Sequence, residues 1–344
     1  MKQVPLGNTG LMVSEVGFGG IPLTRISQDE AVALLRAALD KGFTYFDTAR
    51  MYGDSEVKMG QALEGRRDQV ILATKTMKRG GQEMTQEIEA SLEALRTSYI
   101  DLYQMHNLVK PEDIEALSDP DGAYQALLRA KQEGKVGHIG FSSHHPDMAI
   151  KAIETGLFAT VQFACNFVED QAAGRVFGAA KERGMGCVAM KPLGGGLLER
   201  ADLCFTWLQG QEGVLPIPGM QSMSELEEIA DLYENRRELN QADLDEMQRI
   251  RDELGTHFCH RCGYCMPCPN GINIPKVMLF TSQSRRFPPQ HLIKASKDFI
   301  LHAEQSCEDC GECSERCPYE LPIPEMLSEI TAAFRDFMAQ HGQA

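Results

Sequence analysis

The stretch VILATKTMKRGGQEMTQEIEASLEALRTSYIDLYQMH, residues 70–106, contains one complete strand, helix and strand unit. Its two ends, residues 70–74 and 100–105, are rich in β-branched and aromatic residues, which favour strands. Between them, residues 86–98 carry Ile88, Leu92 and Leu95 at spacings of four and three, as an amphipathic helix requires. The stretch therefore predicts two parallel strands joined by a crossover helix.

The same alternation extends over residues 15 to about 235. Helical segments are expected at residues 29–40, 122–132 and 222–233 as well. Besides the two strands above, strands are expected at residues 15–19, 44–47, 138–142, 160–163, 186–190 and 214–217. Eight such units in roughly 220 residues predict a protein of the α/β class with a (β/α)8 TIM barrel, since an open doubly wound sheet typically uses five or six strands.

The alternation stops near residue 255, and cysteines then appear at intervals of three. We therefore expect two domains, a barrel over residues 1–250 and a mainly helical C-terminal domain over residues 251–344. Helices are expected there at residues 274–280 and 292–303. A closing amphipathic helix is marked by Leu327, Ile330, Phe334 and Met338.

Composition excludes several classes of protein. Of the 344 residues, 43% are hydrophobic and 24% are charged, which is ordinary globular usage. Lys and Arg total 34 against 49 Asp and Glu, and the net charge of -15 disfavours nucleic acid as a partner. Nothing approaches the roughly 18 apolar residues of a membrane span or resembles a signal peptide, so we expect a cytoplasmic protein with no membrane association.

Eight of the 11 cysteines form two clusters near the C-terminus. The second cluster has the spacing C-x2-C-x2-C-x3-C-P, the signature of a 4Fe-4S ferredoxin module, and the first ends one residue shorter as C-x2-C-x2-C-x2-C-P. Zinc is the competing metal, because four thiolates also form a tetrahedral site. If the fourth cysteine of each run crosses over, one cluster is held by Cys259, Cys262, Cys265 and Cys317 and the other by Cys268, Cys307, Cys310 and Cys313.

Four polar residues follow successive strands of the predicted barrel, where active sites of such barrels lie. They are Asp47 and Tyr52 in YFDTARMYG, Lys75 in ILATKT and His106 in DLYQMH. Taken singly, each residue is as readily explained as a helix cap, a satisfied polar group or a solvated charge. Together they closely resemble the catalytic tetrad of the aldo-keto reductases, as do the opening LGNTGLMVSEVGFGG and the SE...GQALEG after Tyr52.

The resemblance implies reduction of a carbonyl by hydride from a nicotinamide. Tyr52 is then the general acid, and Lys75, held by Asp47, favours the phenolate that proton transfer leaves. His106 orients the carbonyl by a hydrogen bond. The substrate is expected to be a small carbonyl compound or alcohol.

The cofactor side follows the family only in part. Ser142, Gln162 and the nearby Asn166 match residues that hold the nicotinamide carboxamide, whereas Met190 stands where an aromatic ring is usual. Because Gln221 stands where the family often has Arg or Lys, NADH is preferred to NADPH. The dinucleotide phosphates are expected near Leu193, Gly194, Gly219 and Ser222, and Glu228 stands near this helix where the family has Asn.

The whole chain thus resembles an iron-sulfur member of the aldo-keto reductase family, with two 4Fe-4S clusters. Nicotinamides pass two electrons as hydride and clusters pass one at a time, so direct exchange needs a centre such as a flavin, which the sequence does not exclude. The first hypothesis is a carbonyl oxidoreductase whose clusters transfer electrons, with an electron-transfer protein as partner. The alternatives are a redox-sensing or electron-transfer protein with the barrel as a docking scaffold, and purely structural clusters.

Overall fold

The computed structural model describes residues 1–255, 257–259, 265–285, 287–317 and 320–342. Their contacts divide the chain into two compact units. The first comprises Met1–Leu193 with Leu198–Glu238, and the second comprises Gly194–Leu197 with Leu239–Ala344. The division falls before helix α10 (Gln241–Gly255), earlier than the boundary at residue 250, because the contacts of this helix group it with the second unit.

The first unit is built on eight parallel strands in sequential order. Backbone N–H groups of Gly17 and Gly19 donate to the carbonyls of Pro216 (2.9 Å) and Pro218 (2.7 Å), which closes the ring between the first and last strands. The barrel predicted from the sequence is therefore confirmed. Its strands are β3 (Phe18–Gly19), β4 (Tyr45–Asp47), β5 (Ile71–Thr76), β6 (Ile100–Met105), β7 (Val136–Ser142), β8 (Thr160–Ala164), β9 (Gly186–Met190) and β10 (Val214–Pro216).

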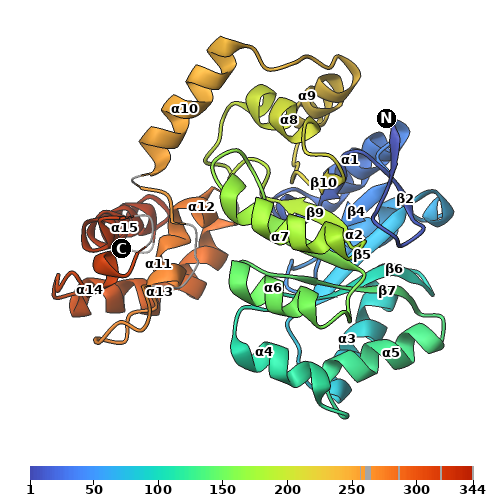
Figure 1. Cartoon of the computed structure of the whole chain (residues 1–344), viewed down its shortest axis with the longest axis horizontal. Coiled ribbons are helices and arrows are strands. Elements are labelled where there is room, and N and C mark those ends of the chain that lie inside the picture. The colour runs from blue at the N-terminus through green and yellow to red at the C-terminus, as the bar shows by residue number, and fades with distance from the viewer. Residues whose placement is uncertain (256, 260–264, 286, 318–319, 343–344) are drawn as a thin grey trace. The chain divides into compact units, whose positions relative to one another are not determined.

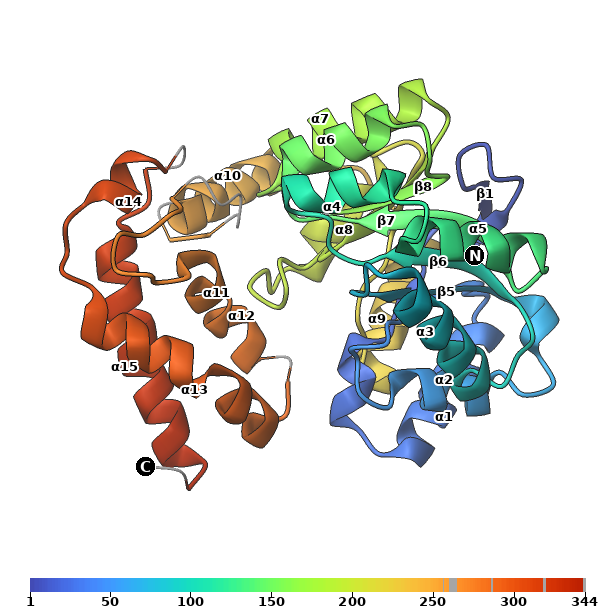
Figure 2. The same cartoon turned by 90° about the horizontal axis from the view of Figure 1, so that it is seen from below.

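Helices surround the strands of this unit (Figures 1 and 2). The main core lies between the two layers and includes Phe46 and Phe141 from strands and Leu35, Ile88 and Leu127 from helices. The helices are α1 (Gln28–Asp40), α2 (Ser55–Ala62), α3 (Gly81–Ala94), α4 (Pro111–Glu115), α5 (Ala123–Gln132), α6 (Pro146–Glu154), α7 (Asp170–Glu182), α8 (Ala201–Gln209) and α9 (Met223–Glu234), with short 3-10 turns at η1 (Ile21–Arg25), η2 (Arg67–Gln69) and η3 (Ala116–Ser118).

A hairpin of β1 (Gln3–Pro5) and β2 (Met12–Ser14) precedes the barrel. Its Leu6 and Val13 join a separate apolar cluster with inward side chains of the strands, among them Tyr45 and Leu102. The amide of Asn8 donates to the carbonyl of Gly184 (2.7 Å), just before β9 begins. The hairpin therefore covers the N-terminal end of the barrel and leaves the opposite end, where the strands finish, for chemistry.

The second unit is mainly helical, as predicted. Its core contains Ile274, Val277, Ile293 and Phe334, and the predicted closing helix buries the face expected of it. Its helices after α10 are α11 (Ile274–Met278), α12 (Phe280–Ser284), α13 (Pro289–Ser306), α14 (Glu312–Glu315) and α15 (Ile323–Gln340).

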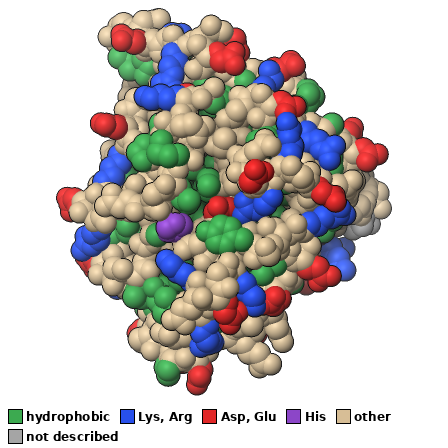
Figure 3. Space-filling view, turned by 90° about the vertical axis from the view of Figure 1, so that its right-hand side faces the viewer, with side chains coloured by type: hydrophobic (Ala, Val, Ile, Leu, Met, Phe, Trp, Pro, Cys, Tyr) green, Lys and Arg blue, Asp and Glu red, His purple; other side chains and the backbone are tan. Residues whose placement is uncertain are grey.

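The described residues include no helix that is long and apolar enough to cross a membrane. On the face shown in Figure 3, basic and acidic side chains are interspersed, and that face has no continuous basic surface of the kind that binds nucleic acid.

Candidate active site

A buried ion pair lies at the carboxyl ends of β4 and β5. The Lys75 ammonium donates to Asp47 Oδ1 (2.6 Å) and to the carbonyl of Thr48 (2.9 Å). Lys75 is 1% exposed and Asp47 is 2% exposed. Parallel pairing of adjacent strands places these residues side by side, because Asp47 is in register with Ala73, two residues before Lys75. A lysine this deeply buried requires such partners.

Tyr52 lies in the loop between β4 and α2, with the centre of its ring 5.2 Å from Lys75 Nζ. The loop is tied down at Arg50, whose amide donates to the Lys75 carbonyl (3.0 Å). The Arg50 guanidinium pairs with the buried carboxylate of Glu56 (2.5 Å), and Glu56 also accepts from Thr74 Oγ1 (2.7 Å). These bonds fix the loop to β5 and α2 and hold Tyr52 against the Lys75 ammonium.

His106 follows β6 directly and completes the group. Its ring meets the Tyr52 ring edge to face, with the ring centres 6.1 Å apart. The Arg79 guanidinium donates to the His106 carbonyl (2.8 Å), which fixes the backbone there. His106 Nδ1 is buried and has no hydrogen-bond partner among the described residues. The structure thus places Asp47, Tyr52, Lys75 and His106 together at one end of the barrel.

Burial and neighbouring charge act on the ionisation of this group. Burial alone would lower the pKa of Lys75, but the charge of Asp47, with Tyr52, raises its pKa above the usual value. Burial raises the pKa of Asp47, and Lys75 opposes the shift. Burial, with the nearby charges of Lys75 and Arg79, holds the pKa of His106 well below its usual range. His106 is therefore a neutral imidazole near pH 7, a hydrogen-bond donor without a charge.

Ser142 and Gln162 lie near this group, and Asn166 is engaged elsewhere. Ser142 ends β7, and its hydroxyl accepts from the amide of Asn107 (2.9 Å). Gln162, on β8, is 2% exposed. The Asn166 side-chain amide donates to Glu169 Oε2 (2.8 Å) in its own loop and to the carbonyl of Lys191 (3.1 Å), so it connects that loop to the segment after β9.

The residues after β9 are divided between the two units. Met190 is partly buried against the apolar cluster inside the barrel, and Leu193 packs on the main core. Gly194 begins the short segment that belongs to the second unit. It has φ +58°, a left-handed conformation that favours glycine.

The N-terminus of α9, the expected phosphate site, is occupied by the carboxylate of Glu225 from the first turn of the same helix. Ser222 caps the helix by accepting from the Glu225 amide (3.2 Å), and Glu225 Oε2 accepts from the Gln221 amide (2.7 Å). Arg25, which no sequence motif marks, also lies here, with its Nη1 3.5 Å from Gln221 Oε1. Gly219 forms a bridge with Gly19 between the first and last strands. Glu228 is exposed one turn further along α9.

Cysteine side chains from both runs meet around one small cavity in the second unit. Cys268 lines it together with Cys307, Cys310 and Cys313. Four thiols around a hollow are the donor set of a 4Fe-4S cluster, so these residues fit that group. No three Cys, His, Asp or Glu side chains in the described ranges are placed as the ligands of a single metal ion.

The remaining cysteine positions are only partly described. Cys265 is buried, and Cys259 and Cys317 are partly buried against the core of the second unit. Cys262 lies outside the described residues.

Residues 15–203 match the model of the aldo/keto reductase family, which is more than half of the chain. The chain belongs to the aldo/keto reductase family. Residues 258–322 match the 4Fe-4S dicluster domain, so the protein is an aldo-keto reductase-like oxidoreductase that carries an iron-sulfur domain. Both parts of the resemblance drawn from the sequence are therefore confirmed.

Individual relatives match part of the chain. L-galactose dehydrogenase of Arabidopsis thaliana is 33% identical over 212 residues, 56% of this chain and 66% of that protein. An aldo-keto reductase of Bacillus subtilis is 34% identical over 162 residues, 42% of this chain and 47% of that protein. An aldo-keto reductase from Bacillus halodurans, solved in a holo form, superposes with a TM-score of 0.64 at 25% identity, covering 73% of this chain and 96% of that one.

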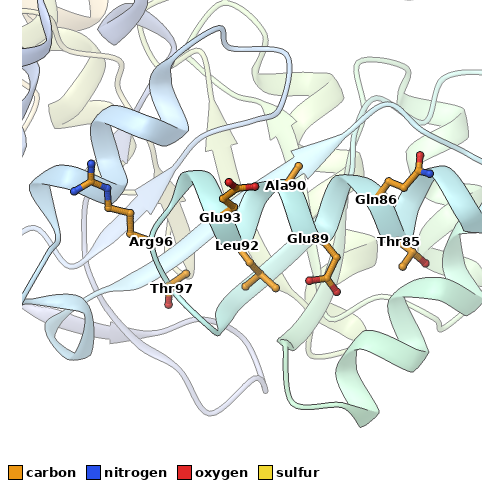
Figure 4. A pocket seen from close by; sticks show the side chains of 8 residues that line it. All are labelled: Thr85, Gln86, Glu89, Ala90, Leu92, Glu93, Arg96 and Thr97. Carbon is orange, nitrogen blue, oxygen red and sulfur yellow. The ribbon is translucent and has the colours of Figure 1, made fainter.

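A second hollow runs along the outer surface of α3 (Figure 4). It is wide and open, and its charged residues pair with neighbouring elements: Arg96 with Glu64 (2.9 Å) and Glu89 with Lys135 (2.7 Å). None of the four catalytic candidates lines it. The four catalytic candidates therefore lie apart from this hollow.

Proposed function

We propose that this aldo/keto reductase interconverts a carbonyl compound and its alcohol with a nicotinamide, using Asp47, Tyr52, Lys75 and His106 as its catalytic group. One observation carries the proposal: a buried lysine, neutralised by Asp47, lies against the Tyr52 ring. A phenol near pKa 10 is a reluctant acid at neutral pH unless a nearby cation favours its anion. Lys75 supplies that cation.

In the reductive direction a bound nicotinamide supplies hydride to the carbonyl carbon. Tyr52 then gives its hydroxyl proton to the carbonyl oxygen, which becomes the alcohol, and Lys75 stabilises the phenolate that remains. Neutral His106 donates a hydrogen bond to the same oxygen without competing as an acid. Because L-galactose dehydrogenase is among the relatives, aldoses belong in the substrate panel with simple aldehydes, ketones and alcohols.

The nicotinamide carboxamide is assigned to Ser142 and Gln162. The preference for NADH rested on the missing cation at Gln221, but Arg25 brings a guanidinium to that residue from η1. A 2′-phosphate at this position would therefore find a cation in Arg25, and NADPH is a cofactor candidate beside NADH. Equilibrium titration with NADH and NADPH, in wild type and Arg25→Ala, measures the preference directly.

For the iron-sulfur domain we propose two 4Fe-4S clusters that transfer electrons to a protein partner. Cys268, Cys307, Cys310 and Cys313 would hold one, and Cys259, Cys262, Cys265 and Cys317 the other. Cys310 is exposed, which favours exchange with an external partner over a purely structural role. A 4Fe-4S cluster passes single electrons, so coupling to hydride chemistry needs a centre such as a flavin that passes both one and two electrons. We also propose that the protein works in the cytoplasm, where thiols stay reduced.

The test is anaerobic. Protein with reconstituted clusters is mixed with NADH or NADPH, and the nicotinamide band and the iron-sulfur absorption are followed in wild type and Tyr52→Phe. Nicotinamide oxidation that requires a carbonyl and is lost in the variant supports the reductase. If neither nicotinamide binds and only a low-potential donor reduces the clusters, the barrel is a scaffold and the proposal is wrong.

A further inference from the structure

Three polar side chains form a layer inside the barrel where apolar residues are the rule. Asp47, Gln104 and Gln162 come from β4, β6 and β8, which alternate around the ring. Inward side chains of alternate strands meet in one layer, and such layers are normally filled by Val, Ile and Leu. Gln104 is 0% exposed. A buried amide in a position that suits leucine needs a reason.

Gln104 contacts both other members of this layer through one nitrogen. Its Nε2 donates to Asp47 Oδ2 (3.3 Å) and to Gln162 Oε1 (2.9 Å), which uses both hydrogens of the amide. A carboxylate accepts and never donates, so the nitrogen of Gln104 must face Asp47. Gln104 Oε1 has no hydrogen-bond partner in the described part of the chain.

The neighbouring strands make room for this arrangement. Gln104 is in register with Lys75 on one side and with Gly140 on the other. A Cβ at Gly140 would lie 3.3 Å from Gln104 Cγ, tighter than most real contacts. The same Cβ would lie even closer to Thr160 Oγ1, so Thr160 is the first neighbour to exclude a side chain at residue 140, and Gln104 uses part of the space that this glycine leaves.

We propose that Gln104 is a positioning residue that couples the Asp47–Lys75 pair to the nicotinamide site at Gln162. The inference rests on the proposed function, in which Gln162 contacts the carboxamide. With Oδ2 held by Gln104, the Asp47 carboxylate keeps Oδ1 on Lys75. Gln162 also hydrogen-bonds the Asp47 carboxylate directly. With its oxygen held by the Gln104 nitrogen, the Gln162 amide keeps one orientation toward both Asp47 and the cofactor. Cofactor binding at Gln162 therefore alters the hydrogen bonds of the Asp47 carboxylate.

Substitutions that keep the size of Gln104 but change its hydrogen bonding distinguish a packing role from a positioning role. Gln104→Met keeps the volume but leaves Asp47 Oδ2 and Gln162 Oε1 without this donor, so the thermal midpoint falls, and the loss of function is compared with that loss of stability. Gln104→Glu keeps the shape but puts a second negative charge beside Asp47. Gln209→Met, on α8, makes the same chemical change where the amide donates only to the Leu232 carbonyl (2.9 Å).

The experiment measures nicotinamide dissociation constants, the pH profile of kcat/KM and the 13C signal of the Asp47 carboxyl in the full chain. We expect Gln104→Met to weaken nicotinamide binding and kcat/KM by about tenfold each, and Gln104→Glu to lower kcat/KM by about a hundredfold. The acid limb of the profile moves to higher pH, because Asp47 loses a donor that favours its anion. Gln209→Met behaves as wild type.

In wild type, adding nicotinamide shifts the Asp47 signal, and in Gln104→Met that shift becomes smaller, because only the direct contact of Gln162 with Asp47 remains. Wild-type protein that binds no nicotinamide overturns both this inference and the proposed function. Wild type that binds nicotinamide, with an Asp47 signal that does not respond or responds equally in Gln104→Met, overturns the inference alone. Equal losses in the Met and Glu variants, in proportion to lost stability, would show that Gln104 only packs.

Discussion

The Lys75 ammonium lies 2.6 Å from the Asp47 carboxylate inside a barrel where both side chains are almost fully buried. Water is excluded from the pair, so each charge depends on the other for its solvation. Besides donating to Asp47 and to the Thr48 carbonyl, the Lys75 ammonium faces the Tyr52 ring. Burying the pair costs free energy of desolvation in the folded protein. Stabilisation of a phenolate at Tyr52 explains why the protein keeps this pair.

Removal of one partner should destabilise the barrel. Lys75→Met leaves Asp47 buried without a counter-charge, and we expect a loss of about 3–5 kcal/mol in the free energy of unfolding. The double variant Asp47→Leu with Lys75→Met should recover most of that loss and stay inactive. Urea unfolding of the three proteins measures this. A double variant no more stable than Lys75→Met would argue against the pair as the cause.

His106 should make stability fall in mild acid. Its pKa is well below 6.5 in the folded protein and returns to about 6.5 on unfolding, so the unfolded chain binds a proton that the folded one refuses. The stability that depends on neutral His106 is complete above pH 6.5 and is lost as the pH falls below it. The urea midpoint is measured at pH 7.5 and 5.5. We expect it to fall less between these pH values in His106→Gln than in wild type. Equal losses would mean that His106 titrates normally.

Arg25 should act on NADPH and not on NADH. Its guanidinium is placed beside Gln221, where a 2′-phosphate is expected, so Arg25→Ala should raise the Kd for NADPH about tenfold and leave that for NADH within about twofold. Arg36→Ala, on α1, is the matched control. Among the described residues, the Arg36 guanidinium donates to the backbone carbonyls of Gln61 and Ala62 in α2. Equal effects of Arg25→Ala on both nicotinamides would place the phosphate elsewhere.

The two clusters should be lost along the crossed pairing. Because Cys268 shares a cavity with Cys307, Cys310 and Cys313, Cys268→Ser and Cys310→Ser should each remove the same cluster and about half of the iron. Cys317→Ser should remove the other. Iron content and the electron paramagnetic resonance of the reduced proteins distinguish the two. If Cys317→Ser abolishes the same signal as Cys310→Ser, and Cys268→Ser abolishes the other, the pairing is sequential and not crossed.

The strands were predictable because buried parallel strands are short apolar runs with turn residues at both ends. Strands β6 and β9 begin and end at the predicted residues. Helix α2 was missed, since its buried face carries Glu56, Lys58 and Gly60 rather than an apolar stripe. Helix α3 ends at Ala94, four residues before the predicted end, and Arg96 just beyond it has φ +51°. Only the folded chain supplies the partners that make those polar faces stable.

The site followed the same rule. Asp47, Lys75 and His106 could be found because each ends a recognisable strand. Gln104 could not, because in IDLYQM it reads as one more position of a buried strand, and its partners lie 57 and 58 residues away along the chain. Arg25 is 196 residues from Gln221. Contacts between strands that alternate around a closed barrel leave no periodic signal in the sequence.

The central claim is that Tyr52 gives the proton while Lys75 stabilises its anion, and a single-turnover experiment tests it most directly. Wild type and Tyr52→Phe, both loaded with nicotinamide under anaerobic conditions, are mixed with a panel of carbonyl compounds that includes aldoses. We expect carbonyl-dependent nicotinamide oxidation in wild type and a rate at least about a hundredfold lower in Tyr52→Phe at unchanged nicotinamide Kd. Equal rates in the two proteins would contradict the account.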